Sequence, residues 1–481
     1  MTIRFDTESG GSTVLTGTLS SDKDMSGTIA VANQDPFTRR RFLAGSVAAA
    51  GAIAGSRLDV AASERGPQAQ GVGGFPSGFR WGTATAAHQV EGSNVNSDAW
   101  VLEHMKPSTF AEPSGDACDF YHRYPDDVKL AAGLGFNAFR FSIEWARIEP
   151  EQGFYSRATL DHYRRVLASC HEHGLMPMVT YWHFTSPRWF AALGGWENPA
   201  AGDHFVRYCE RAAKHLGDLI GAASTLNEPN IPTLLRWAFS NMPQDPTPQI
   251  QDGMKLAAKA IGAERFSYFI FGDVETSRDS MVSAHHRALA AIKSGPGTYP
   301  VGVSLAILDD QGVGEGNRRD EKRRLLYEPW LEAAGKSDFV GVQTYSRARV
   351  GSKGDLPPEQ GVELTQMGYE FWPESLEQTI RYAASHAKVP VYVTENGIAT
   401  EDDKRRVEYI RRAVAGVRNC LADGIDVRGY FHWSLLDNFE WNYGYRPKFG
   451  LVAVNRETFE RTVKPSARFL GEVARRNGVG I

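Results

Sequence analysis

The chain has 481 residues, of which 42% are hydrophobic and 23% are charged, and its formal net charge is −4. These are ordinary values for a globular protein, and the dispersed Lys and Arg residues give no basic groove, so no nucleic-acid partner is expected. The length accommodates two or three average domains, or one large barrel with an extension.

The N-terminal region does not have the pattern of a folded domain. Residues 1–37 are rich in Gly, Ser, Thr and Asp, which predicts a disordered lead. Residues 38–62 begin with Thr38, followed by Arg39 and Arg40, and continue into an Ala/Gly-rich apolar run that is too short to span a bilayer. This segment resembles a twin-arginine signal, which predicts export to the cell envelope or the extracellular space. If translation starts further downstream, the protein is cytoplasmic instead. Residues 63–74 are interpreted as a linker.

Cysteine and histidine spacing gives no metal motif. His171 and His173 stand two residues apart, whereas ligands on one face of a helix would be three or four apart. Gly174 follows them as a helix C-cap, so both are expected at the end of a helix. No metal site and no stable membrane insertion are predicted. The cysteines are widely separated, and their pairing is left open: Cys118, Cys170, Cys209 and Cys420.

From residue 75 onward, strand patterns alternate with amphipathic helical patterns such as 161–174 and 403–424. Parallel strands buried on both faces have nearly continuous apolar sequences. The expected strands are 79–85, 137–142, 176–182, 222–226, 300–307, 338–345, 389–395 and 428–433. Eight such units predict a single (β/α)₈ TIM barrel over 75–481, with inserted loops or helices in the gap at 230–298. An open doubly wound sheet is the alternative, but no GxGxxG motif follows an early strand.

Polar side chains stand where several expected strands end, which is where barrel enzymes carry their chemistry. They are Arg140, His183, Asn227, Glu228, Tyr345, Glu395 and Trp433. Seven such groups on one rim predict a site for a polyol.

Two of these groups, Glu228 and Glu395, are carboxylates on different strands. Glycosidic hydrolysis uses such a pair, one to protonate the leaving oxygen and one to attack carbon or activate water. Pairing with Arg140 is expected to keep Glu395 ionised, whereas Glu228 requires a raised pKa to act as an acid. The alternative is that both glutamates are ion-paired groups that seal the barrel.

Several long motifs resemble glycoside hydrolase family 1, the β-glucosidase family, and together they span the chain from residue 75 to its end. They are "FPSGFRWGTATAAHQVEG", "FRFSIEWARIEP", "TLNEPN", "TENG" and "HWSLLDNFEWNYGYRPKFGL". The resemblance implies a retaining mechanism through a covalent glycosyl-enzyme, with Glu228 as acid/base and Glu395 as nucleophile. It also implies that Arg140 and Tyr345 contact the nucleophile. The residues implied to hold the sugar are Gln89, His183, Asn227, Trp433, Glu440 and Trp441, together with Tyr345.

The chain departs from the family pattern beside the pocket. Phe184 lies in "WHFTSP" where the family often has "YHWDLP", and Gln343 and Thr344 lie in "QTY" where it often has "NYY". These changes leave the catalytic pair intact but affect the leaving group and the sugar preference.

The sequence therefore predicts a β-glucosidase that releases terminal β-D-glucosyl residues from small glycosides without a metal or organic cofactor. A β-galactosidase or β-fucosidase, a transglycosidase, and a non-catalytic sugar-binding barrel are the alternatives. The retained glutamate pair argues against the last of these.

Overall fold

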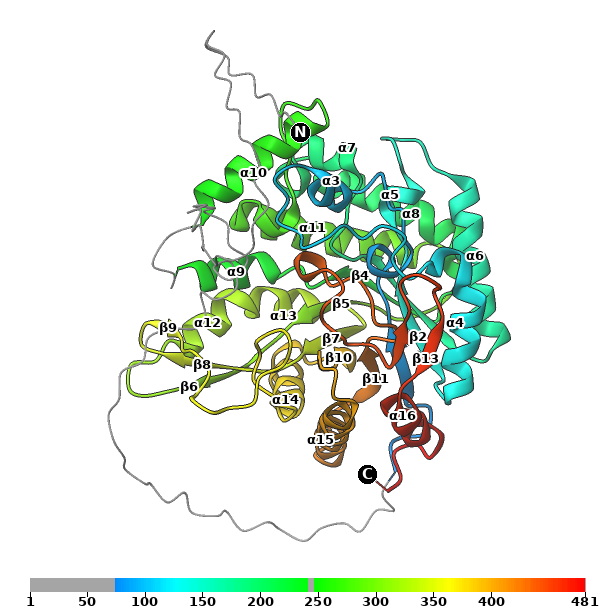
Figure 1. The fold of residues 1–481 in the computed structure, drawn as a ribbon, viewed down its shortest axis with the longest axis vertical. Coiled ribbons are helices and arrows are strands. Elements are labelled where there is room, and N and C mark those ends of the chain that lie inside the picture. The colour runs from blue at the N-terminus through cyan, green and yellow to red at the C-terminus, as the bar shows by residue number, and fades with distance from the viewer. Residues whose placement is uncertain (1–73, 241–245, 481) are drawn as a thin grey trace, which may run out of the picture. The chain divides into compact units, whose positions relative to one another are not determined.

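A closed barrel of eight parallel strands forms the centre of the domain (Figure 1). The structure is a computed structural model that describes residues 74–240 and 246–480. The predicted disordered lead, signal segment and nearly all of the linker lie outside these residues. The barrel strands are β1 (Arg80–Ala84), β2 (Ala138–Ser142), β3 (Met176–Trp182), β4 (Ala222–Asn227), β5 (Val301–Ala306), β7 (Phe339–Thr344), β10 (Val391–Asn396) and β11 (Val427–Trp433). The predicted barrel is confirmed, and each predicted strand end lies within two residues of the observed one.

Burial explains why these strands were recognisable. β5 and β7 are buried along their whole lengths, so helices cover one face and the barrel interior covers the other. β7 pairs with β5 on one side and with β10 on the other. Gly341 lies in β7 where an added Cβ would collide with the Ser304 hydroxyl, so the glycine allows the neighbouring strands to approach.

Helices connect and cover the strands, and polar side chains cap the N-termini of two of them, α6 and α15. α6 begins after Ser156, whose hydroxyl accepts a hydrogen bond from the amide of Thr159, and α15 begins after Asp402. The remaining helices are α2 (Ala87–Val90), α3 (Asp98–His104), α4 (Phe120–Leu134), α5 (Trp145–Ile148), α7 (Arg188–Ala192), α8 (Ala201–Leu216), α12 (Arg319–Leu326), α13 (Glu328–Ala334), α14 (Ser375–Ala387) and α16 (Pro465–Arg475), with α6 (Arg157–Glu172) and α15 (Asp403–Ala422) as predicted. His171 lies in the last turn of α6 and His173 is its C-cap, and both rings contact backbone carbonyls.

The predicted insertion between the fourth and fifth strands is helical. It contains α9 (Ile231–Phe239), α10 (Thr247–Ala260), the 3₁₀ turn η4 (Phe269–Phe271) and α11 (Val274–Lys293). Figure 1 shows α9 and α10 in green. Shorter 3₁₀ turns are η2 (Gly195–Glu197), η3 (Gly217–Leu219) and η5 (Trp441–Tyr443).

Two small sheets lie outside the barrel. β6 (Asp309–Gly312), β8 (Arg347–Gly351) and β9 (Gly354–Asp355) form one sheet, seen beside α12 in Figure 1. β12 (Val452–Val454) and β13 (Arg461–Val463) form the other. All four cysteines are buried free thiols. Among the described residues, no helix is both long and apolar enough to span a membrane.

Candidate active site

A cavity of about 310 Å³ lies at the carboxyl ends of the barrel strands. It brings together most of the predicted site residues: Gln89, His183, Glu228, Tyr345, Glu395, Trp433, Glu440 and Trp441. Arg140 and Asn227 lie behind this surface and are hydrogen-bonded to each other. A larger hollow of about 1320 Å³ lies among α9, α10 and η4 but contains neither glutamate. The chemistry is therefore placed in the smaller cavity.

Three donors hold the carboxylate of Glu395, one from β2 and two from the carboxyl end of β7. Arg140 Nη1 donates to Oε1 at 2.6 Å, and Gln343 Nε2 donates to the same oxygen at 3.0 Å. The Tyr345 hydroxyl donates to Oε2 at 2.6 Å. The predicted contacts of Arg140 and Tyr345 with Glu395 are present, and the barrel fixes both oxygens of this carboxylate.

Gln343 completes a closed ring of hydrogen bonds around Glu395. Its Nε2 also donates to Asn227 Oδ1 at 2.8 Å, and Arg140 Nη2 donates to the same Asn227 oxygen at 2.6 Å. Because two donors occupy Oδ1, the Asn227 amide nitrogen faces the other way, 3.3 Å from His183 Nε2. Gln343 therefore orients a nucleophile candidate and a sugar-binding amide at once.

Sequence reasoning did not assign Gln343 to the site. It treated the residue only as a departure from the family pattern. The available signal was its position two residues before Tyr345, near the end of a buried strand. A long amide reaches two neighbours from this position, but its partners are more than 50 residues away along the chain.

Glu228 follows directly after β4, in a left-handed backbone conformation with φ of 45°. Such a conformation is uncommon for a residue with a side chain and is often found at functional sites. The Glu228 amide donates to Ser304 O of β5 at 2.8 Å, which anchors it to the barrel. Burial raises the pKa of Glu228 well above its usual value, and the nearby Glu395 and Glu440 carboxylates raise it further. The raised pKa expected of an acid is thus present.

Glu395 has the more favourable environment for a negative charge. Burial raises its pKa above the usual value, while Arg140, Tyr345 and Gln343 lower it. Arg140 makes the largest of the lowering contributions, in line with the predicted pairing, but burial outweighs it. Since Glu228 lacks the three donors, we assign the first ionisation of the pair to Glu395.

Glu440 turns into the cavity, where Gln89 Nε2 lies 3.4 Å from its Oε2. The same Gln89 nitrogen donates to Phe439 O at 2.8 Å, so the two side chains are held together. Burial and the Glu395 charge raise the pKa of Glu440 to about 8, although Trp433 and Gln89 hydrogen bonds lower it. This pKa favours the protonated form of Glu440 near neutral pH.

Aromatic rings enclose the same cavity. The rings of His183 and Trp433 stack at 5.8 Å, and those of His88 and Trp441 stack at 5.5 Å with an interplanar angle of 4°. Burial and Arg140 lower the pKa of His183 well below its usual value, so its ring is neutral. The neutral His183 ring and the Trp433 indole provide flat surfaces in the cavity that suit the apolar face of a sugar.

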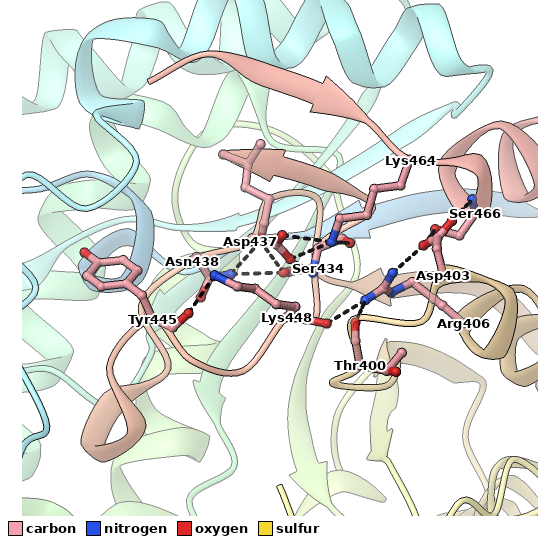
Figure 2. A network of polar contacts seen from close by, with 12 residues as sticks. Thr400, Asp403, Arg406, Ser434, Asp437, Asn438, Tyr445, Lys448, Lys464 and Ser466 are labelled. Carbon is pink, nitrogen blue, oxygen red and sulfur yellow. Dashed lines mark hydrogen bonds and ion pairs between the residues drawn. The ribbon is translucent and has the colours of Figure 1, made fainter. Parts of the chain in front are cut away.

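A buried polar network holds the loop 434–450, which carries Glu440 and Trp441 (Figure 2). Lys464 Nζ donates to Asp437 at 2.8 Å, and the Arg406 guanidinium donates to Lys448 O at 2.6 Å. These cations belong to α15 and to the residue before α16. Residues at the starts of α15 and α16 therefore hold this loop in place through hydrogen bonds.

A parallel barrel with two buried glutamates at the ends of β4 and β10, one of them held by three donors, defines a glycoside hydrolase that uses paired carboxylates. The family described as "Glycosyl hydrolase family 1" matches residues 72–303 and 331–479. The chain belongs to this family, whose enzymes are retaining β-glycosidases. The resemblance found in the sequence motifs is confirmed.

Named relatives agree with this membership. The chain is 31% identical over 458 residues to Beta-glucosidase A of Acetivibrio thermocellus, covering 84% of this chain and 99% of the relative. It is 31% identical over 471 residues to a bifunctional beta-D-glucosidase/beta-D-fucosidase of Bifidobacterium breve, covering 82% and 96%. Among solved structures, a beta-glucosidase designated 1317 superposes with a TM-score of 0.80 at 52% identity, covering 83% of this chain and 98% of that one.

Proposed function

We propose that the protein is a β-glucosidase that removes terminal β-D-glucosyl residues from small glycosides, with Glu395 as nucleophile and Glu228 as acid/base. The observation that carries the assignment is the asymmetry between the two carboxylates. Three donors hold Glu395, whereas burial and two neighbouring carboxylates keep a proton on Glu228.

The reaction proceeds by two displacements. In the first, a Glu395 oxygen attacks the anomeric carbon, the bond to the glycosidic oxygen breaks, and Glu228 gives its proton to that oxygen. In the second, Glu228 takes a proton from water, the water oxygen bonds to the anomeric carbon, and Glu395 leaves as a carboxylate. Each displacement inverts the carbon, so the β configuration is retained.

The polar side chains of the cavity suit a neutral hexose. Arg140 and Gln343 occupy the Asn227 oxygen, so the Asn227 amide nitrogen, beside His183, is the group of this residue that would donate to the hydroxyl next to the anomeric carbon. Gln89 Oε1, which has no partner among the described residues, and the Glu440 carboxyl group are available to the distant hydroxyls, and Trp433 provides a flat surface.

Proton NMR during hydrolysis of an aryl β-glucoside tests the proposal. We expect β-glucose to appear first and to mutarotate afterwards, and α-glucose as the first product would contradict the assignment of Glu395. A parallel panel of nitrophenyl β-glucoside, β-galactoside and β-fucoside measures the sugar preference. We expect the glucoside to have the highest kcat/KM.

We also infer that the protein is exported through its twin-arginine-like segment. Support comes from the sequence alone, where Arg39 and Arg40 precede Phe42, Leu43 and a short apolar run. Replacing both arginines with lysine is expected to leave the precursor inside the cell with its hydrolase activity intact. Undiminished export of this variant would contradict the inference.

A further inference from the structure

A buried histidine–glutamate pair lies outside the cavity lining and takes no part in the two displacements. His88 Nε2 of α2 and Glu103 Oε1 of α3 are 2.6 Å apart, and both side chains are fully buried. Neither is among the described residues that line the cavity. Burying such a pair costs desolvation free energy that two apolar side chains would not, so the pair calls for a role beyond filling space.

Hydrogen bonds at two edges fix the plane of the His88 ring. Glu103 contacts Nε2, and Asn94 Nδ2 lies 3.1 Å from Nδ1. The ring is parallel to the Trp441 indole, with an interplanar angle of 4°. Trp441 itself lines the cavity. A ring that the sugar does not touch therefore supports an indole that the sugar meets.

Glu103 also connects this ring to the chain segment that holds the loop 434–450. Its Oε2 accepts hydrogen bonds from Ser114 N at 3.0 Å and from the Ser114 hydroxyl at 2.8 Å. Ser114 O in turn accepts a hydrogen bond from the hydroxyl of Tyr445, a residue of this loop that is labelled in Figure 2. One carboxylate thus joins α2, α3 and the loop that carries Trp441.

The charge state of Glu103 differs from that of other buried acids in the surrounding elements. Burial raises the pKa values of Glu91, Asp98 and Glu144 above their usual range. Burial acts on Glu103 in the same direction, but the pairing with His88 and the donated hydrogen bonds outweigh it and hold its pKa below the usual value. Glu103 is therefore ionised at neutral pH, and its charge attracts the Nε2–H group of His88.

We propose that Glu103 is a positioning residue that, through His88, fixes the plane of the Trp441 indole and so the fit of the glucosyl ring. This inference rests on the proposed β-glucosidase function and on the sugar contact that the sequence motifs imply for Trp441. Without Glu103, the His88 ring can rotate about its side-chain bonds, and Trp441 loses its flat support. The sugar then meets an indole in several orientations, only one of which is productive, so kcat/KM falls.

A double-mutant cycle in the full-length protein, with nitrophenyl β-glucoside as substrate, tests this positioning role. Glu103→Gln should lower kcat/KM about tenfold. In a Trp441→Ala background the same substitution should change kcat/KM by less than about twofold, because the residue through which Glu103 acts is absent. Equal losses in the two backgrounds would overturn the proposal.

Fluorescence provides a readout that does not depend on turnover. The contribution of Trp441 is the difference between the emission spectra of the wild-type protein and the Trp441→Ala variant. When both proteins also carry Glu103→Gln, this difference should move to longer wavelength, because an indole without its support is more accessible to water. An unchanged difference spectrum would also overturn the proposal.

A second variant separates positioning from folding. His88→Leu/Glu103→Gln keeps an amide that accepts from Ser114 and leaves no charge unpaired, so it should fold and still lose about tenfold in kcat/KM. Asp127→Asn is the matched control, since this buried carboxylate pairs with Arg461 at 2.8 Å and does not line the cavity. It should lower Tm but change kcat/KM by less than about twofold. Wild-type kcat/KM in the double variant, or a comparable loss in the control, would contradict the positioning role.

Wild-type turnover distinguishes failure of this inference from failure of the function on which it rests. Hydrolysis of nitrophenyl β-glucoside together with an additive cycle contradicts only the role of Glu103. Absence of turnover on every β-glucoside contradicts the proposed β-glucosidase itself, and the Trp441 fluorescence then still tests whether Glu103 positions the indole.

Discussion

The floor and the outer wall of the cavity are built on different principles. Floor groups such as Arg140, Asn227 and Gln343 come from barrel strands and are joined in a ring of hydrogen bonds. The other lining residues form the wall and come from connections between strands, namely α9, η4, the loop that contains Met367 and Tyr369, and the loop that contains Asn442 and Tyr443.

This difference separates catalysis from specificity. A catalytic carboxylate must be held within a fraction of an ångström, and hydrogen bonds across parallel strands provide that rigidity. An aglycone surface needs only the right shape and polarity, which a loop supplies. Substitutions in the floor should therefore reduce turnover of all glycosides, whereas those in the wall should change the order of preference among them.

The largest effect is expected at Glu395. Glu395→Ala removes the atom that forms the covalent intermediate, so kcat should fall by at least about ten-thousandfold on every β-glucoside. The exposed Glu401 lies in the loop after the same strand, and Glu401→Ala should leave kcat unchanged. Circular dichroism verifies that both variants fold. Substantial activity in Glu395→Ala would exclude this residue as the nucleophile.

Removal of Glu228 should depend on the leaving group. Glu228→Ala should lower kcat/KM on alkyl glucosides by about a thousandfold, but much less on dinitrophenyl glucosides, which need little protonation. Azide should restore turnover with retained configuration. Because the acid is active only while protonated, wild-type activity should fall as pH rises through the raised pKa of Glu228. The variant should lack this alkaline fall. Equal losses on good and poor leaving groups would refute the assignment.

A negatively charged sugar should be rejected by the floor. No Lys or Arg is among the described residues that line the cavity, and Glu440 lies at the proposed end for the distant hydroxyls. We expect kcat/KM for nitrophenyl 6-phospho-β-glucoside to be at least about a hundredfold below that for the unphosphorylated compound. The pKa of Glu440 is raised to about 8, so its repulsion is weak at low pH and grows as pH rises through that value. The ratio should therefore widen between pH 6 and 9. Similar values for both substrates would show that Glu440 does not contact the sugar.

Substitution of Gln343 should have the smallest effect on activity of the four predicted changes. It should also shift one limb of the pH profile. Gln343→Met keeps the side-chain length but removes both donated hydrogen bonds, so kcat should fall by about tenfold. Loss of a donor raises the pKa of Glu395, which must be ionised, so the acid limb of the pH profile should move to higher pH. The loss should be smaller on 2-deoxyglucosides, which cannot use the Asn227 amide. An unmoved acid limb would show that Gln343 supports the fold alone.

Sequence reasoning recovered the barrel because its strands are buried on both faces and therefore apolar throughout. It also singled out Glu228 and Glu395, which the structure brings into one cavity, because a carboxylate at the end of an apolar strand is costly unless its charge is used. The predicted and observed strands differ by at most two residues at their ends. The strand predicted at 389–395, for example, is observed as β10 (Val391–Asn396). Asn396 belongs to the strand because it pairs with Thr344 of β7, and its side chain also donates to Thr344 O at 2.7 Å.

The sequence alone determined the family and the eight-stranded barrel and pointed to Glu228 and Glu395 as a pair, since these depend on local pattern and on motifs. The tertiary structure determined the pKa values and the hydrogen-bond partners of these groups. The net pKa of Glu395 depends on burial against three donors that lie 50, 52 and 255 residues away along the chain. The double role of Gln343 and the stacking of His88 on Trp441 likewise arise only when the barrel closes, because desolvation and hydrogen bonding depend on distances in space and not on separation in sequence.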